Sequence, residues 1–296
     1  MSNSESEREC VVSLLESLVT TDGYHASRIH GVRFIRAANA ARVPVVYEPS
    51  IVIIAQGRKV GYLGDHVYTY DAHNYLVLSV PLPFECETQA TPEKPLLGVS
   101  ITVDPTTLSE LLLEMDDRGA VSETVQGIYS QPMTDELISA LLRLLECLRS
   151  PADSRVLGSS IVREIIYRVL CGEQSAALRA VAARHSHFGQ INKVLRRIHS
   201  DYSYSFDVET LAREASMSVS TFHHNFRAVT STSPLQYIKS IRLHKARMLM
   251  VQEGIQASVA ARQVGYESPS QFSREFKRFF GETPAEEAAR MRAARG

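Results

Sequence analysis

The sequence predicts an α+β protein: a small antiparallel β-barrel with flanking helices, followed by an all-α domain in which a long helix joins two helix-turn-helix units. Two observations favour this class. The first 118 residues or so are rich in short Val-, Ile-, Tyr- and Thr-containing runs. From about residue 188 onward the pattern is helical and contains an internal repeat. A chain of 296 residues has the length of about two ordinary domains.

After a helix predicted near 6–20, the β-like runs extend over about 24–118 and include "PVVYEPSIVIIAQG", "RKVGYLG" and "DHVYTYDAHNYLVLSV". Gly57, Gly61 and Gly64, the last followed by Asp65, indicate tight turns. Short strands at this spacing are typical of a small antiparallel barrel or jelly roll.

Residues 133–171 then predict two helices with apolar stripes, "MTDELISALLRLLECLRS" and "DSRVLGSSIVREIIYRVLCG", separated at Pro151. Before them, Asp104 is the expected N-cap of a helix that starts at Pro105. One stripe can cover the barrel while the other meets a second subunit. Both stripes can equally be intramolecular core, and the pattern leaves these alternatives open. The Ala-, Ser- and Gln-rich residues 173–187 are expected to be a linker.

The last region, 188–296, repeats one layout over 207–234 and 256–284. Each copy has a short helix with a central Ala, a turn, and a second helix with two Phe four residues apart. Between the copies, residues 233–252 predict a long helix with apolar and basic positions. A short helix, a turn and a second helix make a helix-turn-helix, whose second helix enters the DNA major groove.

The charge distribution agrees with this division. Residues 187–296 hold 16 Lys and Arg against 10 Asp and Glu, a net of +6, whereas residues 1–186 hold 16 against 23, a net of −7. A basic C-terminal module joined to an acidic one favours nucleic-acid binding by the former. No apolar run reaches the length that crosses a bilayer, and the N-terminus does not resemble a secretory signal. Four scattered cysteines without a CxxC pair fit a reducing cytoplasm.

The second unit carries the sharper predictions. Gly265 suits a turn with positive φ, and Ser268 followed by Pro269 marks the start of the recognition helix. Phe272 and Phe276 share a face that is expected to anchor this helix in its domain. On the opposite face the residues expected to read base edges are Ser270, Gln271 and Arg274, and those expected to contact phosphates are Lys277 and Arg278.

In the first unit, the exposed face of the second helix is predicted to carry the base-reading residues Ser220, His223 and His224 and the phosphate contact Arg227. Lys239 of the long helix is a further expected phosphate contact. Adjacent histidines on a helix point about 100° apart, so a metal site at this pair is disfavoured.

On these motifs, residues 188–288 resemble the DNA-binding domain of the AraC/XylS family of bacterial transcription regulators. The segment "VGYESPSQFSREFKRFFGETP" matches the family signature nearly position by position. Two residues depart from the family pattern: His224 replaces a common Arg, and Glu287 replaces a common aromatic residue. "YEPSIVIIAQGRKVGYLGDHVYTYDAHNYLVLSVPLPFE" and "PEKPLLGVSI" resemble the cupin-like sensor of one AraC-type subgroup.

The resemblance implies three parts: a cupin-like sensor and dimerisation domain over 1–172, with its barrel at 24–118 and its helices at 133–171, a linker over 173–187, and a double helix-turn-helix domain over 188–296. It implies a cytoplasmic, sequence-specific regulator that binds double-stranded promoter DNA as a homodimer. A small-molecule effector in the barrel and contact with RNA polymerase are further expectations. The sequence does not indicate the effector, the target genes, or activation versus repression.

No enzymatic role is predicted for the barrel. Its main run offers His66 and His73 but no HxH pair, and the one HxH, His185 to His187, lies in the linker, so neither a metal nor another cofactor is expected. Residues that could line an effector pocket are Tyr62, Tyr68, Tyr70, Tyr75, Phe84 and Cys86. Two alternatives remain: an effector-independent regulator whose barrel only dimerises, and an enzymatic or ligand-storage cupin recruited to DNA.

Overall fold

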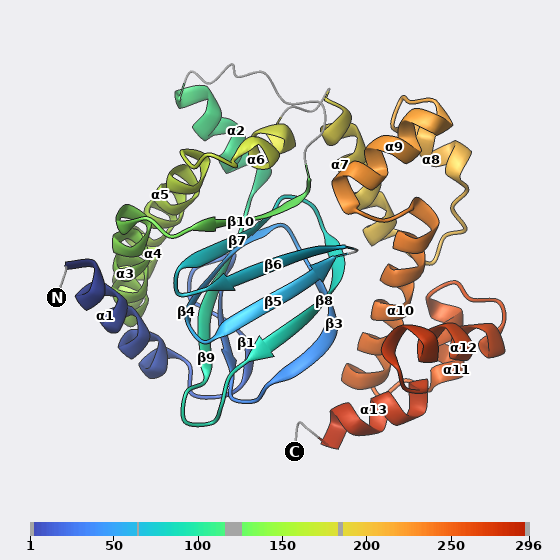
Figure 1. Cartoon of the computed structure of the whole chain (residues 1–296), viewed down its shortest axis with the longest axis horizontal. Coiled ribbons are helices and arrows are strands. Elements are labelled where there is room, and N and C mark those ends of the chain that lie inside the picture. Colours follow the sequence, from blue (N-terminus) through green and yellow to red (C-terminus); the bar gives the residue numbers. More distant parts are fainter. Residues whose placement is uncertain (1–2, 64, 116–125, 183–185, 294–296) are drawn as a thin grey trace.

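The computed structural model describes residues 3–63, 65–115, 126–182 and 186–293, and Figure 1 shows a curved sheet with helices on both sides of it. The strands are β1 (Gly23–Ala26), β2 (Val32–Ala37), β3 (Ala41–Tyr47), β4 (Ser50–Gln56), β5 (Arg58–Leu63), β6 (His66–Asp71), β7 (Asn74–Leu78), β8 (Leu82–Gln89), β9 (Leu96–Thr102) and β10 (Ile128–Pro132).

The strands form one antiparallel sheet in the order β1-β2-β9-β4-β7-β6-β5-β8-β3, with β10 paired to β7. The sheet curls into a half-barrel whose first and last strands, β1 and β3, are not joined by a backbone ladder. The predicted antiparallel β-domain is therefore confirmed. Strand β10 lies beyond the predicted range of 24–118.

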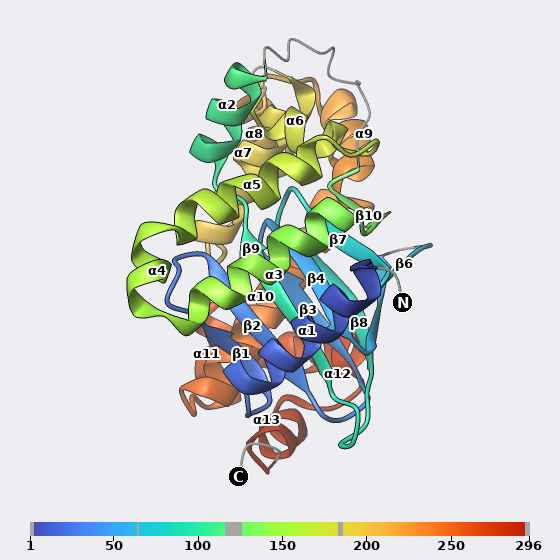
Figure 2. The same ribbon diagram turned by 90° about the vertical axis from the view of Figure 1, so that its left-hand side faces the viewer.

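Alternate residues of each central strand are buried on opposite faces of this sheet. In β4, Ile51 and Ile53 face the outer layer of helices, whereas Val52 and Ile54 face the inside of the half-barrel. The outer helices in Figures 1 and 2 are α1 (Asn3–Leu18), α2 (Pro105–Glu114), α3 (Asp135–Arg149), α4 (Pro151–Val156), α5 (Gly158–Leu170) and α6 (Ala176–Ala182). Asp104 caps α2 as predicted, since its carboxylate accepts the Thr107 N–H at 2.9 Å.

The helices of the C-terminal region are α7 (His187–Ser200), α8 (Val208–Glu214), α9 (Val219–Thr230), α10 (Pro234–Gln252), α11 (Ala257–Gln263), α12 (Pro269–Phe280) and α13 (Pro284–Ala293). Helices α8 and α9 form the first helix-turn-helix unit and α11 and α12 the second, with α10 between them, as predicted (Figure 1). The segment expected to be a linker contains α6, whose apolar side chains are buried against the sheet domain.

The first unit packs directly on the half-barrel. The inner face of the sheet and helices α7 to α10 share one continuous apolar core. Within it, the hydroxyl of the fully buried Tyr237 donates to the Pro81 carbonyl at 2.7 Å and lies 2.8 Å from His199 Nε2. Because the Tyr237 hydroxyl donates its one proton to Pro81, its oxygen is the acceptor in the contact with His199, and His199 Nε2 is the donor. The Gly127 N–H donates to the Val229 carbonyl in α9 at 3.0 Å. The first recognition helix is thus hydrogen-bonded to the N-terminal domain.

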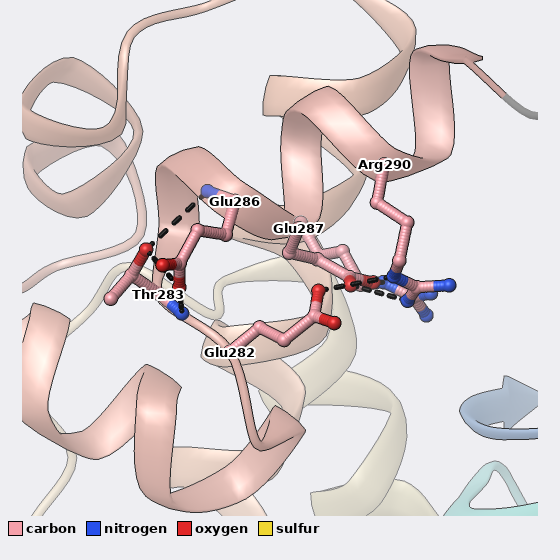
Figure 3. Close-up of polar contacts among 6 residues, drawn as sticks. Glu282, Thr283, Glu286, Glu287 and Arg290 are labelled. Carbon is pink, nitrogen blue, oxygen red and sulfur yellow. Dashed lines mark hydrogen bonds and ion pairs between the residues drawn. The ribbon is translucent and has the colours of Figure 1, made fainter.

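Helix α13 is fixed by a buried carboxylate at the position where the resemblance implies an aromatic residue. Glu287 is 1% exposed and accepts Arg247 of α10 at 2.6 Å and Arg290 at 2.5 Å. Figure 3 shows this group beside the capping pair, in which Thr283 N–H donates to Glu286 at 2.9 Å. Ion pairs therefore add to the packing of the buried Ala288 in fixing this helix.

His244 of α10 gives the C-terminal domain a predictable acid sensitivity. Its ring is buried edge-on against Phe279 and Phe280. Burial, with a smaller contribution from Arg247, lowers its pKa from 6.5 to about 3. The unfolded chain therefore binds a proton below pH 6.5 that the folded chain does not, and stability falls as the pH falls towards 3.

We expect the free energy of unfolding to drop by roughly 2 kcal/mol between pH 7 and pH 5 through His244 alone. Urea unfolding of the protein and of His244→Leu, measured at both pH values, isolates this part from other groups such as His199. The Leu variant should lose less stability on acidification. Parallel pH curves for the two proteins would contradict the assignment.

Candidate nucleic-acid interface

The second recognition helix, α12, is positioned by its cap and by two phenylalanines. The Ser268 hydroxyl accepts the Gln271 N–H at 3.2 Å, so the helix begins where the sequence predicted. Phe272 and Phe276 are fully buried and hold one face against the domain. All five residues predicted to meet DNA on this helix are exposed: Ser270, Gln271, Arg274, Lys277 and Arg278.

The turn before α12 requires glycine. Gly265 has φ +85°, and a Cβ there would lie 2.4 Å from the Ser203 carbonyl oxygen. The corresponding turn of the first unit uses Ser216 at φ 55°. In both turns the third residue after the short helix, Met217 or Tyr266, donates its backbone N–H to the carbonyl of the central alanine of that helix, at 2.9 Å. The two units therefore share one backbone geometry, but only the second is packed too closely for a side chain.

Helix α9 presents a less basic set of predicted DNA contacts than α12. Ser218 caps it by accepting the Thr221 N–H at 3.2 Å, and its two phenylalanines are buried. The predicted contacts Ser220, His223, His224 and Arg227 all lie exposed on the outer face.

Arg242 of α10 connects the two units, a role that the sequence did not indicate. Its guanidinium donates to the carbonyls of Tyr202 at 2.9 Å, Tyr204 at 2.8 Å and Gly265 at 3.3 Å. The loop before the first unit is thereby held against the turn of the second. Lys239, predicted to contact phosphate, lies 3.2 Å from the Glu275 carboxylate of α12.

The arrangement leaves cations available for an anionic partner. In the part of the chain that the structure describes, Arg227, Arg274 and Arg278 make no ion pair. Guanidinium groups on the face of a helix can bind base edges bidentately or neutralise phosphates. Serine, histidine and glutamine beside them supply neutral donors and acceptors.

The six aromatic and thiol residues predicted to line an effector pocket lie on two faces of the sheet. Tyr70, Phe84 and Cys86 are buried inside the half-barrel, and the half-buried Tyr68 packs against the same core. Tyr75 instead packs under the outer helices. The remaining member is Tyr62, whose hydroxyl donates to Glu87 at 3.0 Å and whose ring lies 4.2 Å from the Arg42 guanidinium carbon. The structure does not bring all six together.

Sequence reasoning missed a buried lysine at the centre of the half-barrel. Lys59 of β5 is 5% exposed, and its ammonium donates to the hydroxyls of Tyr47 at 2.9 Å and Tyr24 at 3.2 Å. Burial opposes its charge, but these phenol oxygens hold the pKa of Lys59 above its usual value. From Tyr47 the hydroxyl chain continues through Tyr70 to the Cys86 thiol. Along β5, every second residue lies on one face of the sheet, and these residues are Lys59, Gly61 and Leu63. This two-residue period is visible in the sequence.

This network spans the open side of the sheet. Tyr24 lies in β1 and Tyr47 in β3, the two edge strands, and their hydroxyls are 3.0 Å apart. Side chains rather than a backbone ladder thus join the edges of the half-barrel. We call the opening between β1–β2 and β3 the seam.

A cavity of about 1070 Å³ lies at the seam and is shared by both domains. Its wall includes Tyr24, Tyr47 and several valines and prolines of the sheet domain. The charged groups on its wall are Arg33, Arg196, Arg247 and the single carboxylate Glu48, together with the histidines His30 and His244. None of the six predicted pocket residues lines it. A second cavity, of about 810 Å³, lies near Arg58 and is lined by the N-terminal domain alone.

Among the residues that the structure describes, no three His, Cys, Asp or Glu side chains gather as a metal site would require. Within the same residues, no helix is both long and apolar enough to cross a membrane.

A rigid pair of helix-turn-helix units with exposed cations defines a class of protein, the sequence-specific DNA-binding proteins. Residues 28–177 match the family model for the AraC-type transcriptional regulator N-terminus, and residues 211–290 match a helix-turn-helix domain model. The chain belongs to the AraC-type transcriptional regulators.

Relatives include the RCS-specific transcriptional activator RclR of Escherichia coli, 35% identical over 103 residues, which are 35% of this chain and 36% of RclR. The virulence regulon transcriptional activator VirF of Yersinia enterocolitica is 24% identical over 65% of this chain and 69% of its own. The chain also matches the Msm operon regulatory protein of Streptococcus mutans at 23% identity, over 51% of this chain and 55% of that protein. The matches thus span about a third to two thirds of these relatives.

Among solved structures, ToxT from Vibrio cholerae has a similar fold, with a TM-score of 0.56 over 88% of this chain and 97% of ToxT at 14% identity. Other ToxT structures are described as bound to an unsaturated fatty acid (TM-score 0.53, 13% identity, 90% of this chain and 97% of ToxT) and to (E)-4-(8-methylnaphthalen-1-yl)but-3-enoic acid (TM-score 0.58, 14% identity, 88% and 98%). The shared fold confirms the predicted combination of β-domain and helical DNA-binding domain.

Proposed function

We propose that this regulator reads promoter DNA through α9 and α12 and that a small anionic molecule in the seam cavity controls it. The observation that carries the first part is the exposed polar and basic face of α12, held in place by buried phenylalanines. In this assignment Ser220, His223, His224, Ser270, Gln271 and Arg274 face bases, and Arg227, Lys277 and Arg278 face phosphates. Lys239 pairs with Glu275 in the free protein, so its phosphate contact requires that pair to open.

Replacing Arg274 by alanine tests the base-reading assignment. We expect a loss of about 1–3 kcal/mol of binding free energy and a relaxed preference at the contacted position. Selection from a randomised double-stranded DNA library gives the preferred site, and titration of that site gives the affinity. An Arg274→Ala variant with unchanged affinity and preference would remove this residue from the reading face.

Lys277→Ala is the matched comparison one turn further along the same helix. A phosphate contact carries no sequence information, so the preferred site should stay the same. The slope of log K against log salt should decrease in magnitude by about one. Affinity titrations at several salt concentrations measure this slope, and an unchanged slope would exclude the contact.

The effector part of the proposal depends on the chemistry of the seam cavity. Of the three arginines on its wall, Arg247 already pairs with Glu287, so Arg33 and Arg196 share the wall with the single carboxylate Glu48. The buried ammonium of Lys59 lies behind Tyr24 and Tyr47. An anion bound among these cations gains more Coulomb energy than it would in water, because the effective dielectric constant at the cavity wall is lower. The many valines and prolines of the wall suit an apolar body. An apolar carboxylic acid satisfies both requirements, and the fatty-acid and butenoic-acid complexes of ToxT support this class.

Decanoate and decanol, which share one chain length, separate charge from apolar contact. Decanoate should raise the melting temperature of the full chain and change its DNA affinity, whereas decanol should do so much less. Lys59→Met keeps the volume but removes the charge, and should abolish the difference. Lys94→Met, at an exposed lysine, is the control and should retain it. Equal responses to acid and alcohol would rule out the anionic class.

The remaining partners are proposals of the same kind. A homodimer through α4 and α5 is supported by their exposed apolar side chains, Val156, Leu157 and Tyr167. Light scattering of the full chain and of a Val156→Asp, Leu157→Asp variant tests it, with a monomeric variant as the expected result. As a promoter-binding regulator the protein acts in the cytoplasm without enzymatic activity and contacts RNA polymerase.

A further inference from the structure

On α12, a carboxylate one turn along the helix fixes the amide of the exposed Gln271. Gln271 Nε2 donates to Glu275 Oε1 at 3.2 Å. The same carboxylate accepts the Tyr266 hydroxyl on its other oxygen at 2.8 Å and lies 3.2 Å from the Lys239 ammonium. The turn, the long helix and the recognition helix therefore all hold Glu275 in one orientation.

Glu275 can only accept a hydrogen bond from the Gln271 amide, because its carboxylate is ionised. Its partial burial favours the protonated form, but the hydrogen bonds from Tyr266, Gln271 and Lys239 outweigh this and lower its pKa. An ionised carboxylate accepts hydrogen bonds and donates none. The end of the Gln271 amide that faces Glu275 must then be the nitrogen, whichever way the two ends are first assigned. The carbonyl oxygen, Oε1, lies on the other side.

The hydrogen bond to Glu275 leaves Gln271 with a defined outward pattern. The amide has two N–H groups, of which Glu275 takes one, so one N–H donor and the Oε1 acceptor remain. In the major groove adenine offers an N6 donor beside the N7 acceptor, which complements this pair. Guanine offers two acceptors, O6 and N7, and would place one of them against Oε1.

We propose that Glu275 is a positioning residue for specificity: by holding the Gln271 amide, it makes α12 select adenine over guanine at the base that Gln271 contacts. The inference rests on the proposed function of α12 as a reader of DNA. Without Glu275 the amide can turn over and offer its NH₂ group to guanine. The charge of Glu275 itself is not the cause, since a negative charge near DNA changes affinity for all sequences alike.

The test is selection of the full chain on a randomised double-stranded DNA library, followed by competition between the selected site and its adenine-to-guanine variant. The unaltered protein should prefer adenine by about tenfold at one position of the DNA segment that α12 contacts. Glu275→Gln, which keeps the shape, and Glu275→Ala should both reduce this preference to about twofold or less. Thermal unfolding verifies that each variant is folded.

Glu267→Gln is the matched charge control. Glu267 is exposed just before the cap of α12, and among the described residues no hydrogen bond joins it to the Gln271 side chain. Its replacement removes the same charge and should raise affinity for all sites while keeping the preference for adenine. A loss of preference in this variant equal to that in Glu275→Gln would overturn the proposal, because charge alone would then account for it.

Gln271→Ala separates this inference from the proposed function. If this variant loses the adenine preference while Glu275→Gln keeps it, Gln271 reads the base but Glu275 does not position it, and the inference fails alone. If Gln271→Ala changes no position of the selected site, the base-reading role of Gln271 fails and the inference fails with it. Loss of preference in both variants supports the inference.

Discussion

Replacing Glu287 by alanine is expected to lower the free energy of unfolding by about 3–5 kcal/mol, because removing one member of a buried ion pair takes away a charge that stabilises the other member inside the protein. Arg247, with 12% of its side chain exposed, would lose its 2.6 Å contact while staying inside the domain. Urea unfolding of the full chain at neutral pH measures the loss. The ionised form is the stabilising one: burial opposes it, but Arg290 and Arg247 outweigh burial and lower the pKa of Glu287. This contribution is therefore present above the unfolded pKa and is lost as the pH falls.

Two control variants define what this result means. Glu282→Ala removes the exposed partner of Arg290 and should cost less than about 1 kcal/mol. The double variant Glu287→Leu, Arg247→Met replaces the pair by apolar groups and should recover most of the loss, since well-packed hydrophobic residues often match a buried pair. A Glu287→Ala variant no less stable than Glu282→Ala would show that the pair contributes little.

Gly265→Ala is expected to cost about 3 kcal/mol of stability and to weaken DNA binding. The left-handed backbone of the turn disfavours an L side chain by roughly 1–2 kcal/mol. In addition, the new Cβ would meet the Ser203 carbonyl oxygen at 2.4 Å, and backbone atoms cannot rotate out of the way as a side chain can. The loop at Ser203 must move, and with it the contact between the two units. Urea unfolding and titration of the selected DNA site measure the two effects.

The first unit supplies the matched control for this prediction. Ser216 occupies the corresponding turn at φ 55°, so Ser216→Gly relieves backbone strain in the folded protein. Its only cost is that glycine gives the unfolded chain more conformational freedom. Its stability should change by less than about 1 kcal/mol. If Gly265→Ala proved as mild as Ser216→Gly, the close approach of the Ser203 loop would not be a constraint in solution.

The recognition helices could be placed from sequence because their determinants are local. Ser268, Pro269 and Gly265 act within a few residues of each other, and each has the cap or turn conformation that its chemistry predicts. Which face of α12 is exposed follows directly once Phe272 and Phe276 are known to be buried. The exposure of Arg274 was predictable for the same reason.

The sensor side could not be placed equally well, because it depends on which face of each strand turns inward. Tyr75 differs from Tyr70 in this respect, and nothing local to a tyrosine reveals it. The partners of Lys59 come from strands 35 and 12 residues away, so its burial follows from long-range pairing.

In the DNA-binding domain, the pairing of Lys239 with Glu275 likewise joins residues far apart in sequence, and a phosphate contact was the simpler expectation.

Among the residues that the structure describes, strand β3 forms a ladder with β8 alone, which leaves its other edge without a strand partner. Helix α10 lies against this edge, and Arg247 donates to the carbonyl of Pro44 at 3.1 Å, at a position where proline itself offers no N–H. The DNA-binding domain therefore covers an unpaired strand edge that could otherwise pair with a strand of another chain. An isolated N-terminal half would lack that cover, so self-association measured on it would report strand-to-strand aggregation rather than the native assembly.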